Sequence, residues 1–483
     1  QNAQGQNCLW AYGISGDLPI VLISVSAIHE MDMVEQIIKA HKYWRTKGLK
    51  VDLILLNEDE SSYYQPLEEM LKEEIFNLGC GDLINQYGGL FILNANILPE
   101  EDYILLLSVA RFILRSDEEN ITKQLKIDNN DSSLPPIKKF TTPIENYPLL
   151  EEEEKDLFFY NGYGGFTRDG DEYIIELKDN LQTPTPWINV ISNPDFGFQV
   201  SENGSGFTWA ENSRENKLTP WSNDPTSDPI SEVIYIRDEE DGRIWSPTGL
   251  PIRDQGKYSI HHGWGYSEFY HDSHGINQNL IMYVPLEESI KINLLKLHNH
   301  SDKERRLSLT YYIRPVMGVD LDITLPFILT DWNKEGQCIL IKNPYNTEYP
   351  HSIVGLSCSE EIISYTGDNE EFLGNQGSLV SPKGLMREAL SNRVGGGLDP
   401  CGAIQIDIKL QPNEKKSIGF LLSYGKDIEE IKSLLAQHKD IEYLEKILRE
   451  TKNYWRNLLG KVKVSTPDVS MDYLLNGWLL YQA

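Results

Sequence analysis

The strongest constraint in this sequence is a long region, from residue 157 to about residue 425, in which short strand patterns follow one another with almost no helical periodicity. The strand patterns lie at Tyr173–Leu177, Val233–Ile236, Ile281–Val284, Lys291–Leu297, Leu307–Ile313, Ile404–Leu410 and Ser417–Leu422. Clusters of Gly, Pro, Asn and Asp separate them, as is typical of turns between strands. A region of this length and pattern predicts a large β-sandwich.

The first 125 residues have a different pattern, in which strand and helix signals alternate. Apolar strand-like runs at Leu18–Val25, Val51–Leu56 and Leu90–Leu93 are separated by helical periodicity at Asp32–Lys47 and Tyr64–Leu78. A third helix is predicted from Pro99 to about Leu114, because proline is favoured in the first turn of a helix. This alternation predicts a small α/β domain over residues 1–125.

The remaining segments are predicted to be a linker and two helical parts. Residues 126–156 hold several prolines and the acidic run Glu151–Glu154, which are typical of a linker. The sandwich is predicted to span residues 157–426. After it, helical periodicity predicts a helical linker over residues 427–465. Residues 466–483 begin with the helix-start signal Thr466-Pro467-Asp468 and stay apolar at helical spacing. We therefore expect the first helix of a further domain there, and a chain that is an internal piece of a longer protein.

The charge and the cysteines limit the compartment and the partners. The chain has 73 Asp and Glu against 44 Lys and Arg, a formal net charge of −29. This balance argues against binding nucleic acid or an anionic membrane surface. The longest apolar runs fall well short of the roughly 20 residues that a membrane helix needs. With five widely spaced cysteines that we expect to be reduced, the sequence predicts a cytoplasmic protein. If membrane helices lie upstream, it predicts the cytoplasmic part of an inner-membrane protein.

The histidines raise the question of a metal site. They include His261, His262, His271 and His274, with His298 and His300 on one strand face. No carboxylate or cysteine completes a recognised ligand spacing. We therefore expect ordinary hydrogen-bonded or exposed histidines, no metal and no cofactor.

Residues 160–272 combine aromatic rings with polar side chains. The richest segments are Thr183–Asn189, Gly204–Trp209, Asn212–Asn216 and Thr219–Asp224. Aromatic faces pack on the apolar face of a sugar ring, while amides, carboxylates and guanidinium groups bind its hydroxyls. Composition alone favours the alternative, that the rings pack a sandwich rich in loops. This part of the chain holds many carboxylates, among them Glu202, Glu211, Glu215, Asp224 and Asp228. The sequence cannot select a catalytic pair among them, because their separation in space decides it.

Longer motifs resemble the cellobiose-phosphorylase-like family of inverting glycoside phosphorylases. The resemblance is strongest to the β-1,2-glucan branch, with β-1,2-oligoglucan phosphorylases and the phosphorylase-like C-terminal half of cyclic β-1,2-glucan synthases. It covers nearly the whole chain. The residues that carry it are Leu9–Pro19, Ala40–Trp44, Thr185–Val190, Phe196–Ser201, Asn212–Asn216, Leu218–Asp224, Trp245–Thr248, His262–Tyr266, Gly397–Gly402 and Leu475–Gln482.

The resemblance implies a mainly β fold with α elements. It consists of a galactose-mutarotase-like sandwich at residues 157–426, a helical linker, and the first helix of an (α/α)-barrel at residues 466–483. The catalytic Asp and the phosphate-binding residues would lie on the barrel beyond this chain, so no catalytic residue is expected here. The intact protein would cleave β-1,2-glucan with inorganic phosphate as co-substrate and with inversion, giving α-glucose 1-phosphate. This chain alone is expected to be inactive. The alternative is a non-catalytic carbohydrate-binding or assembly module of a cyclic β-1,2-glucan synthase.

The resemblance also implies a homodimer through the sandwich, with the loop Asn212–Asp224 reaching the neighbour's active-site mouth. We predict that this loop contacts a β-glucan oligosaccharide through Arg214, Asn216, Trp221, Asn223 and Asp224. The fork of Arg214 suits a hydroxyl or a phosphate, the ring of Trp221 suits a glucose face, and the other three suit hydroxyls. The alternative is a loop held by its own hydrogen bonds, with Asn and Asp as turn residues.

Overall fold

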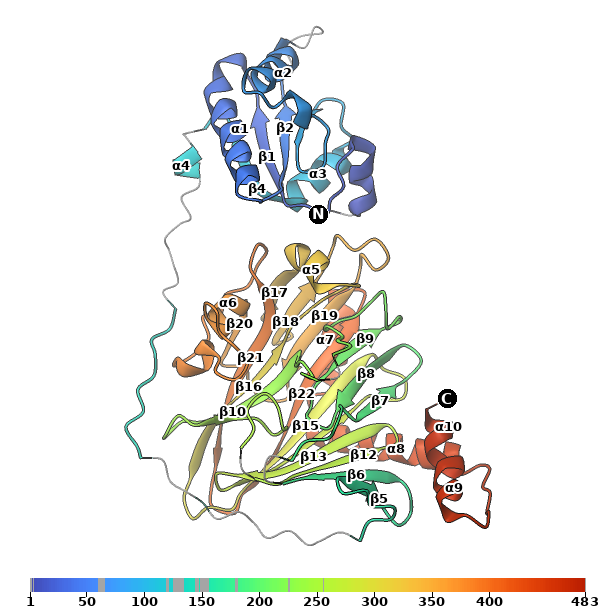
Figure 1. Cartoon of the computed structure of the whole chain (residues 1–483). Helices are drawn as coiled ribbons and strands as arrows, with labels where there is room; N and C mark the ends of the chain where they lie inside the picture. Colours follow the sequence, from blue (N-terminus) through green and yellow to red (C-terminus); the bar gives the residue numbers. More distant parts are fainter. Residues whose placement is uncertain are drawn as a thin grey trace. The chain divides into compact units, whose positions relative to one another are not determined.

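The computed structural model divides into two compact units. It describes residues 2, 4–59, 66–118, 121–124, 134–143, 147, 156–178, 181–224, 226–254 and 256–482. The first unit comprises Gln1–Ser133 with Pro344–Pro350, and the second comprises Leu134–Asn343 with His351–Ala483 (Figure 1). Most of the predicted linker at residues 126–156 lies outside the described residues.

The first unit is built on a four-stranded parallel sheet, which confirms the predicted α/β fold. The strands are β1 (Ile20–Val25), β2 (Asp52–Asn57), β3 (Leu90–Asn94) and β4 (Ala110–Arg115), in the order β3-β2-β1-β4. The helices are α1 (Met31–Thr46), α2 (Pro66–Asn77), α3 (Glu100–Val109) and the short α4 (Ile121–Gln124). All residues of β1 and β2 are buried, as continuous apolar strands at the centre of a parallel sheet should be.

The C-terminal end of one predicted helix in this unit is wrong. The helix that begins after Pro99 ends at Val109 instead of Leu114, and the chain continues as β4. β4 pairs in parallel with β1. The apolar run supplies both elements without a break, so periodicity alone cannot locate the boundary. Pairing with β1 is a long-range interaction, and such tertiary contacts override local helix propensity.

A short segment from later in the chain completes this unit. Tyr345, in Pro344–Pro350, is 4% exposed. It packs so closely on Gly16 that a Cβ there would lie 2.0 Å from the tyrosine oxygen. Gly16 has a φ of +77°, a backbone conformation that glycine adopts without steric cost.

The second unit contains the predicted sandwich. A ten-stranded antiparallel sheet has the order β17-β18-β19-β22-β15-β14-β13-β12-β6-β5, and a five-stranded sheet has the order β11-β10-β16-β21-β20. Their strands are β5 (Gly164–Phe166), β6 (Glu172–Leu177), β10 (Glu232–Asp238), β11 (Ile244–Trp245), β12 (Tyr258–Gly263), β13 (Tyr266–Ser273), β14 (Ile276–Tyr283), β15 (Ile290–Asn299), β16 (Arg305–Ile313), β17 (Leu329–Asn333), β18 (Cys338–Lys342), β19 (Ile353–Cys358), β20 (Ser364–Asp368), β21 (Pro400–Leu410) and β22 (Lys415–Gly425). Each predicted strand pattern overlaps one of these strands.

The main core lies between the two sheets. Ile236, Leu309 and Ile406 of the five-stranded sheet belong to the same fully buried cluster as Leu295 and Phe420 of the ten-stranded sheet. The two packed layers confirm the β-sandwich. Short helices α5 (Leu321–Thr324) and α6 (Asn369–Leu373) lie in its connections.

A third, smaller sheet was not predicted from the sequence. It has the order β7-β8-β9 and consists of β7 (Ile188–Ser192), β8 (Phe196–Ser201) and β9 (Gly206–Ala210). Side chains of β7 alternate between exposed and buried, so one face of this sheet meets solvent.

The C-terminal helices pack on the ten-stranded sheet. Ile431 of α7 (Ile428–Gln437) and Leu444 of α8 (Ile441–Leu459) are buried in one cluster with Leu421 of β22. The chain then forms α9 (Val469–Tyr473), a π-helical turn (Leu474–Trp478) and α10 (Leu479–Tyr481). Asp468 caps α9 by accepting a hydrogen bond from the backbone N–H of Ser470, which confirms the predicted helix start. Across the described residues, no helix is both long and apolar enough to cross a membrane.

Candidate functional site

A cavity of about 310 Å³ lies beside the three-stranded sheet, and we call it the Trp221 pocket. Its walls come from the segment before β7, from β7, β8 and β9, and from the loop that carries Trp221. The lining residues are Thr185, Pro186, Ile188, Gln199, Ser205, Gly206, Phe207, Trp221, Ser222, Asn223, Asp224, Asp228 and Pro229. Small-molecule sites occupy about 300 to 1,000 Å³, so the pocket is large enough for a small ligand.

One wall of the pocket is aromatic. The side chain of Trp221 is 48% exposed, and its ring centroid lies 6.5 Å from that of Phe207. Trp209 continues the row, 5.1 Å from Phe207. It lies over Gly197, where a Cβ would come within 2.6 Å of the indole ring. An exposed ring in such a row suits stacking on the apolar face of a sugar.

The polar side chains of the pocket are ready to accept hydrogen bonds from a ligand. Asp224 Oδ2 accepts from the Ser227 hydroxyl at 2.5 Å, and its Oδ1 accepts from backbone N–H groups. These bonds, that of Ser227 first, lower the pKa of Asp224, which keeps the carboxylate ionised at neutral pH. Asp228 Oδ2 accepts from the Ser201 hydroxyl at 2.7 Å. The described residues give the Asn223 amide no hydrogen-bond partner, so it is available to a ligand.

The buried Glu202 fixes the wall before β7. Its carboxylate accepts hydrogen bonds from the backbone N–H of Trp187 at 2.7 Å, from the amide of Asn203 at 2.9 Å and from the hydroxyl of Thr183. The side chain is 1% exposed, and burial raises its pKa. Because the bonds from Thr183 and Trp187 join the two ends of one loop to Glu202, they hold Thr185 at the pocket.

The buried Glu232 fixes the aromatic wall. It pairs with Lys291 at 2.8 Å and accepts hydrogen bonds from the hydroxyls of Thr219 at 2.8 Å, Thr208 at 2.5 Å and Tyr311 at 3.3 Å. The Thr219 hydroxyl also accepts from the Thr208 backbone N–H at 2.8 Å. Thr208 follows Phe207 in β9, and Thr219 lies two residues before Trp221 in the loop. Glu232 therefore ties strand β9 to the loop.

The structure brings three of the five predicted contact residues together. Trp221, Asn223 and Asp224 line the pocket. Arg214 does not line it, since its side chain is 82% exposed and forms an ion pair with its neighbour in sequence. Asn216 is fully buried, and its amide donates to the Ala210 carbonyl at 2.9 Å.

The first half of the loop is held by its own hydrogen bonds. Asn212 Oδ1 accepts from the backbone N–H groups of Arg214 and Glu215, at 2.9 and 3.0 Å. This turn follows the alternative that the sequence left open, whereas the second half of the loop lines the pocket.

Ten of the thirteen lining residues were not selected as contacts from the sequence, among them Thr185, Gln199, Phe207 and Asp228. Thr185 and Phe207 lie in segments already notable for their aromatic content, so local composition held a signal for them. Asp228 was one of several carboxylates with nothing to distinguish it. Its selection depends on the pairing of strands, which the local sequence does not reveal.

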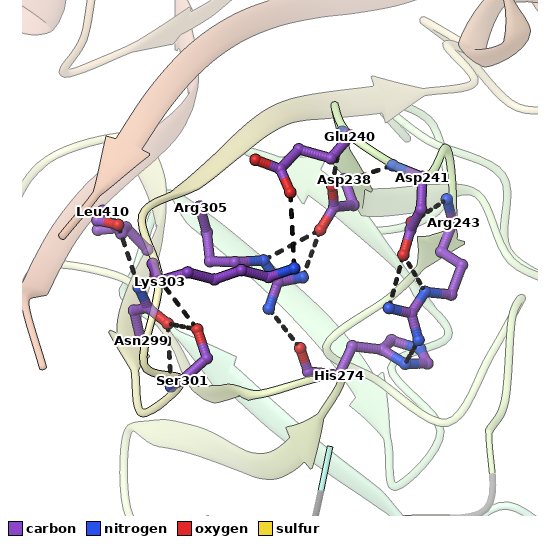
Figure 2. Close-up of polar contacts among 10 residues, drawn as sticks. All are labelled: Asp238, Glu240, Asp241, Arg243, His274, Asn299, Ser301, Lys303, Arg305 and Leu410. Carbon is purple, nitrogen blue, oxygen red and sulfur yellow. Dashed lines mark hydrogen bonds and ion pairs between the residues drawn. The ribbon is translucent and has the colours of Figure 1, made fainter. Parts of the chain in front are cut away.

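A dense polar cluster around Arg305 shares no residue with the Trp221 pocket (Figure 2). Arg305 pairs with buried Asp238 and donates to the His274 carbonyl at 2.6 Å. Arg243 pairs with Asp241 at 2.6 Å. Since its charges are paired internally, we read this cluster as structural. In the described part of the chain, no group of three or more His, Cys, Asp or Glu side chains is placed to hold a metal ion.

Comparison with known proteins adds the family. The model of the glycosyl hydrolase 94 supersandwich domain matches residues 171–441. The cyclic beta-(1,2)-glucan synthase NdvB of Rhizobium meliloti (strain 1021) is 30% identical over 492 residues, which cover 99% of this chain and 17% of that protein. The N,N'-diacetylchitobiose phosphorylase of Vibrio furnissii is 28% identical over 337 residues, covering 66% of this chain and 40% of that protein.

Among solved structures, a galactose mutarotase related enzyme from Lactobacillus acidophilus is 8% identical, with a TM-score of 0.31, and covers 50% of this chain and 97% of that one. The chain spans less than half the length of either relative named above. The family model, in contrast, matches more than half of the chain. The chain belongs to the glycosyl hydrolase 94 family, and its β-sandwich is the supersandwich domain of that family.

Proposed function

We propose that the intact protein is an inverting phosphorylase of β-1,2-glucan and that the Trp221 pocket binds a segment of this glucan. The observation that supports the pocket is that Trp221, Asn223 and Asp224 line one cavity with an exposed ring and two carboxylates. The similarity to a cyclic β-1,2-glucan synthase supports the substrate, and the similarity to an N,N'-diacetylchitobiose phosphorylase supports the reaction.

Each group in the pocket has a role that suits a neutral sugar. The Trp221 ring stacks on the apolar face of a glucose unit. Asp224 and Asp228 accept hydrogen bonds from sugar hydroxyls, and the amide of Asn223 both donates and accepts. A neutral glucan is not repelled by a chain of net charge −29.

In the proposed reaction, inorganic phosphate attacks the anomeric carbon from the face opposite the leaving sugar. A new C–O bond to phosphate forms as the glycosidic C–O bond breaks, and an Asp on the barrel beyond this chain protonates the glycosidic oxygen. The centre inverts and α-glucose 1-phosphate is released. One protein carboxylate is enough, because phosphate is already a nucleophile. This chain positions the glucan, as a homodimer through the sandwich.

The second candidate is a binding or assembly module of a cyclic β-1,2-glucan synthase. It is favoured by the match to NdvB, which extends over 99% of the chain and so includes the first unit. For both candidates we place the chain in the cytoplasm or on the cytoplasmic side of an inner-membrane protein. The pocket would hold glucan in either case.

The test compares the 483-residue chain with a longer gene product that includes the following segment. Each is incubated with β-1,2-oligoglucan and phosphate, and glucose 1-phosphate is measured. The longer product should release it and the 483-residue chain should not. Release by neither form contradicts the phosphorylase, and release by the short chain contradicts a catalytic Asp that lies beyond it. Trp221→Ala in the active form should raise KM at least tenfold, and an unchanged KM contradicts the role of the pocket.

A further inference from the structure

The Trp221 pocket does not use the motif His262–Tyr266. This motif forms the turn between β12 and β13 and packs on the C-terminal helices of the same unit. The Gly265 backbone N–H donates to the Tyr481 hydroxyl at 3.0 Å. A Cβ on Gly477 would come within 2.3 Å of the Trp264 ring. The β-turn and the π-helical turn are therefore closely fitted, and Trp264 and Gly477 both line a cavity there.

We call this cavity the hairpin groove. It has a volume of about 320 Å³ and adjoins a second cavity of about 480 Å³. Both cavities are lined by Arg168, Asp169, Asp171 and Arg456, so they form one groove along the turn between β5 and β6. Among the described residues, none that lines the groove also lines the Trp221 pocket.

The walls of the groove are fixed before any ligand binds. The Tyr473 hydroxyl donates to the Arg168 carbonyl at 2.8 Å. The Trp478 indole N–H donates to the Gly170 carbonyl at 2.9 Å. Because both bonds join the helices to the β5–β6 turn, little conformational freedom remains to be lost on binding, which favours affinity.

Several donors at the groove have no acceptor among the residues that the structure describes. Arg456 Nε donates to Asp171 at 2.6 Å, whereas its terminal nitrogens have no partner among the described residues. The side chains of Arg168 and Lys463 likewise have no partner within that part of the chain. The indole nitrogen of Trp264 is buried without a hydrogen-bond partner there, which is uncommon for a buried donor. A ligand rich in hydroxyls supplies acceptors for the exposed nitrogens of Arg168, Arg456 and Lys463.

The groove carries both cationic and anionic side chains, which favours a neutral polar ligand over an anion. Asp169, Asp171 and Asp472 line the same cavity as the cations, so an anion would meet carboxylates as well. A sugar hydroxyl donates to a carboxylate and accepts from a guanidinium or an ammonium group. The rings of Trp264 and Tyr473 add apolar surface for stacking. We propose that the hairpin groove is a second oligosaccharide site that binds a gluco-oligosaccharide; the choice of glucan rests on the proposed function.

A second site changes how a long glucan binds. Once one segment occupies the Trp221 pocket, binding of another segment in the groove becomes intramolecular and the two affinities reinforce each other. A glucan long enough to reach both sites should therefore bind more tightly than a short one, whereas short oligoglucans should occupy the two sites independently.

The test is calorimetric titration of the 483-residue chain with short β-1,2-oligoglucan. The unmodified chain should bind two equivalents. The double variant Arg168→Ala/Lys463→Ala should weaken one of them at least tenfold, and Trp221→Ala should weaken the other. Lys461→Ala is the matched control, since Lys461 is an exposed lysine beside the groove that does not line it. Melting curves check folding, which the double variant should retain because its two side chains have no described partners.

The outcomes separate the groove from the pocket. If the double variant binds as the unmodified chain does, or if inorganic phosphate titrates in the groove and glucan does not, the groove proposal is overturned. If Trp221→Ala has no effect while the double variant loses one equivalent, the pocket in the proposed function fails and the groove stands. If each variant loses one equivalent of bound glucan and Lys461→Ala binds as the unmodified chain does, the result supports both sites.

Discussion

Glu232 shows how a residue far from solvent shapes a surface site. Burial raises its pKa, but the Lys291 ammonium and the hydrogen bonds from the hydroxyls of Thr208 and Thr219 outweigh this effect and hold the pKa below its usual value. The carboxylate is therefore charged, and it needs its cation. The sequence did not indicate this pair, because Glu232 and Lys291 lie on strands of different sheets.

Lys291→Met should strongly destabilise the second unit. It leaves a buried carboxylate without its cation, which costs about 3 to 5 kcal/mol in comparable cases. Urea denaturation measures the loss. The control is Lys296→Met, because Lys296 is 38% exposed and pairs with Glu445. A surface pair contributes about 0 to 1 kcal/mol, so equal losses in the two variants contradict the role of Lys291.

Glu172 gives a pH-dependent prediction. Burial raises its pKa, but hydrogen bonds and charge from His261, Tyr266 and Lys452 lower it to about 2. The unfolded value is about 4.3. The stabilisation is therefore fully present above the unfolded pKa and is lost as the pH falls toward the folded value.

Glu172→Gln should thus cost about 2 to 3 kcal/mol at pH 7 and about half of that at pH 3, following about 1.4 kcal/mol per pKa unit. Denaturation at pH 7, 5 and 3 measures it. Glu335→Gln is the control, because its side chain is 79% exposed and pairs with Lys432. A deficit for Glu172→Gln that stays the same at pH 3 would falsify the assignment.

Elements with a strong local signal were predictable, and those that depend on long-range pairing were not. The helix start at Asp468 and the strand patterns of the sandwich carry their signals locally. β4 and the sheet of β7, β8 and β9 do not, because their positions follow from partners elsewhere in the chain. The same reason explains the site: Trp221 belongs to a recognisable motif, whereas the pocket role of Asp228 follows from how the segments around it fold.

The turn between β12 and β13 packs closely on the π-helical turn. This packing predicts that Gly477→Ala destabilises the C-terminal helices, whereas helix propensity predicts that it stabilises them. Helix propensity alone favours Gly477→Ala by roughly 0.5 to 1 kcal/mol. The added Cβ would meet the Trp264 ring at 2.3 Å, so we expect Gly477→Ala to destabilise the turn instead. Hydrogen exchange over residues 466–482 should rise while the sandwich core stays protected. Leu475→Ala, in the same turn and 38% exposed, is the control. Slower exchange in Gly477→Ala contradicts the close packing.

At the scale of the whole molecule, the net charge of −29 governs which ligands approach. Its field acts on charged ligands and not on a neutral glucan, and salt screens it over about 10 Å at 0.1 M. The dissociation constant of a β-1,2-oligoglucan should change less than about twofold between 50 and 500 mM NaCl. An oligosaccharide that carries carboxylates is the comparison, and it should bind better as salt rises. A strong salt dependence of the neutral glucan contradicts this picture.

The seating of Tyr345 on Gly16 has a consequence for biosynthesis. Domains generally fold as units during translation, the N-terminal one first. The first unit, however, includes Pro344–Pro350, which is translated after most of the sandwich. During translation, the nascent α/β unit therefore lacks the Tyr345 side chain that is buried in its folded form. Its assembly is complete only when the later segment emerges, so the order of synthesis and the order of folding differ in this chain.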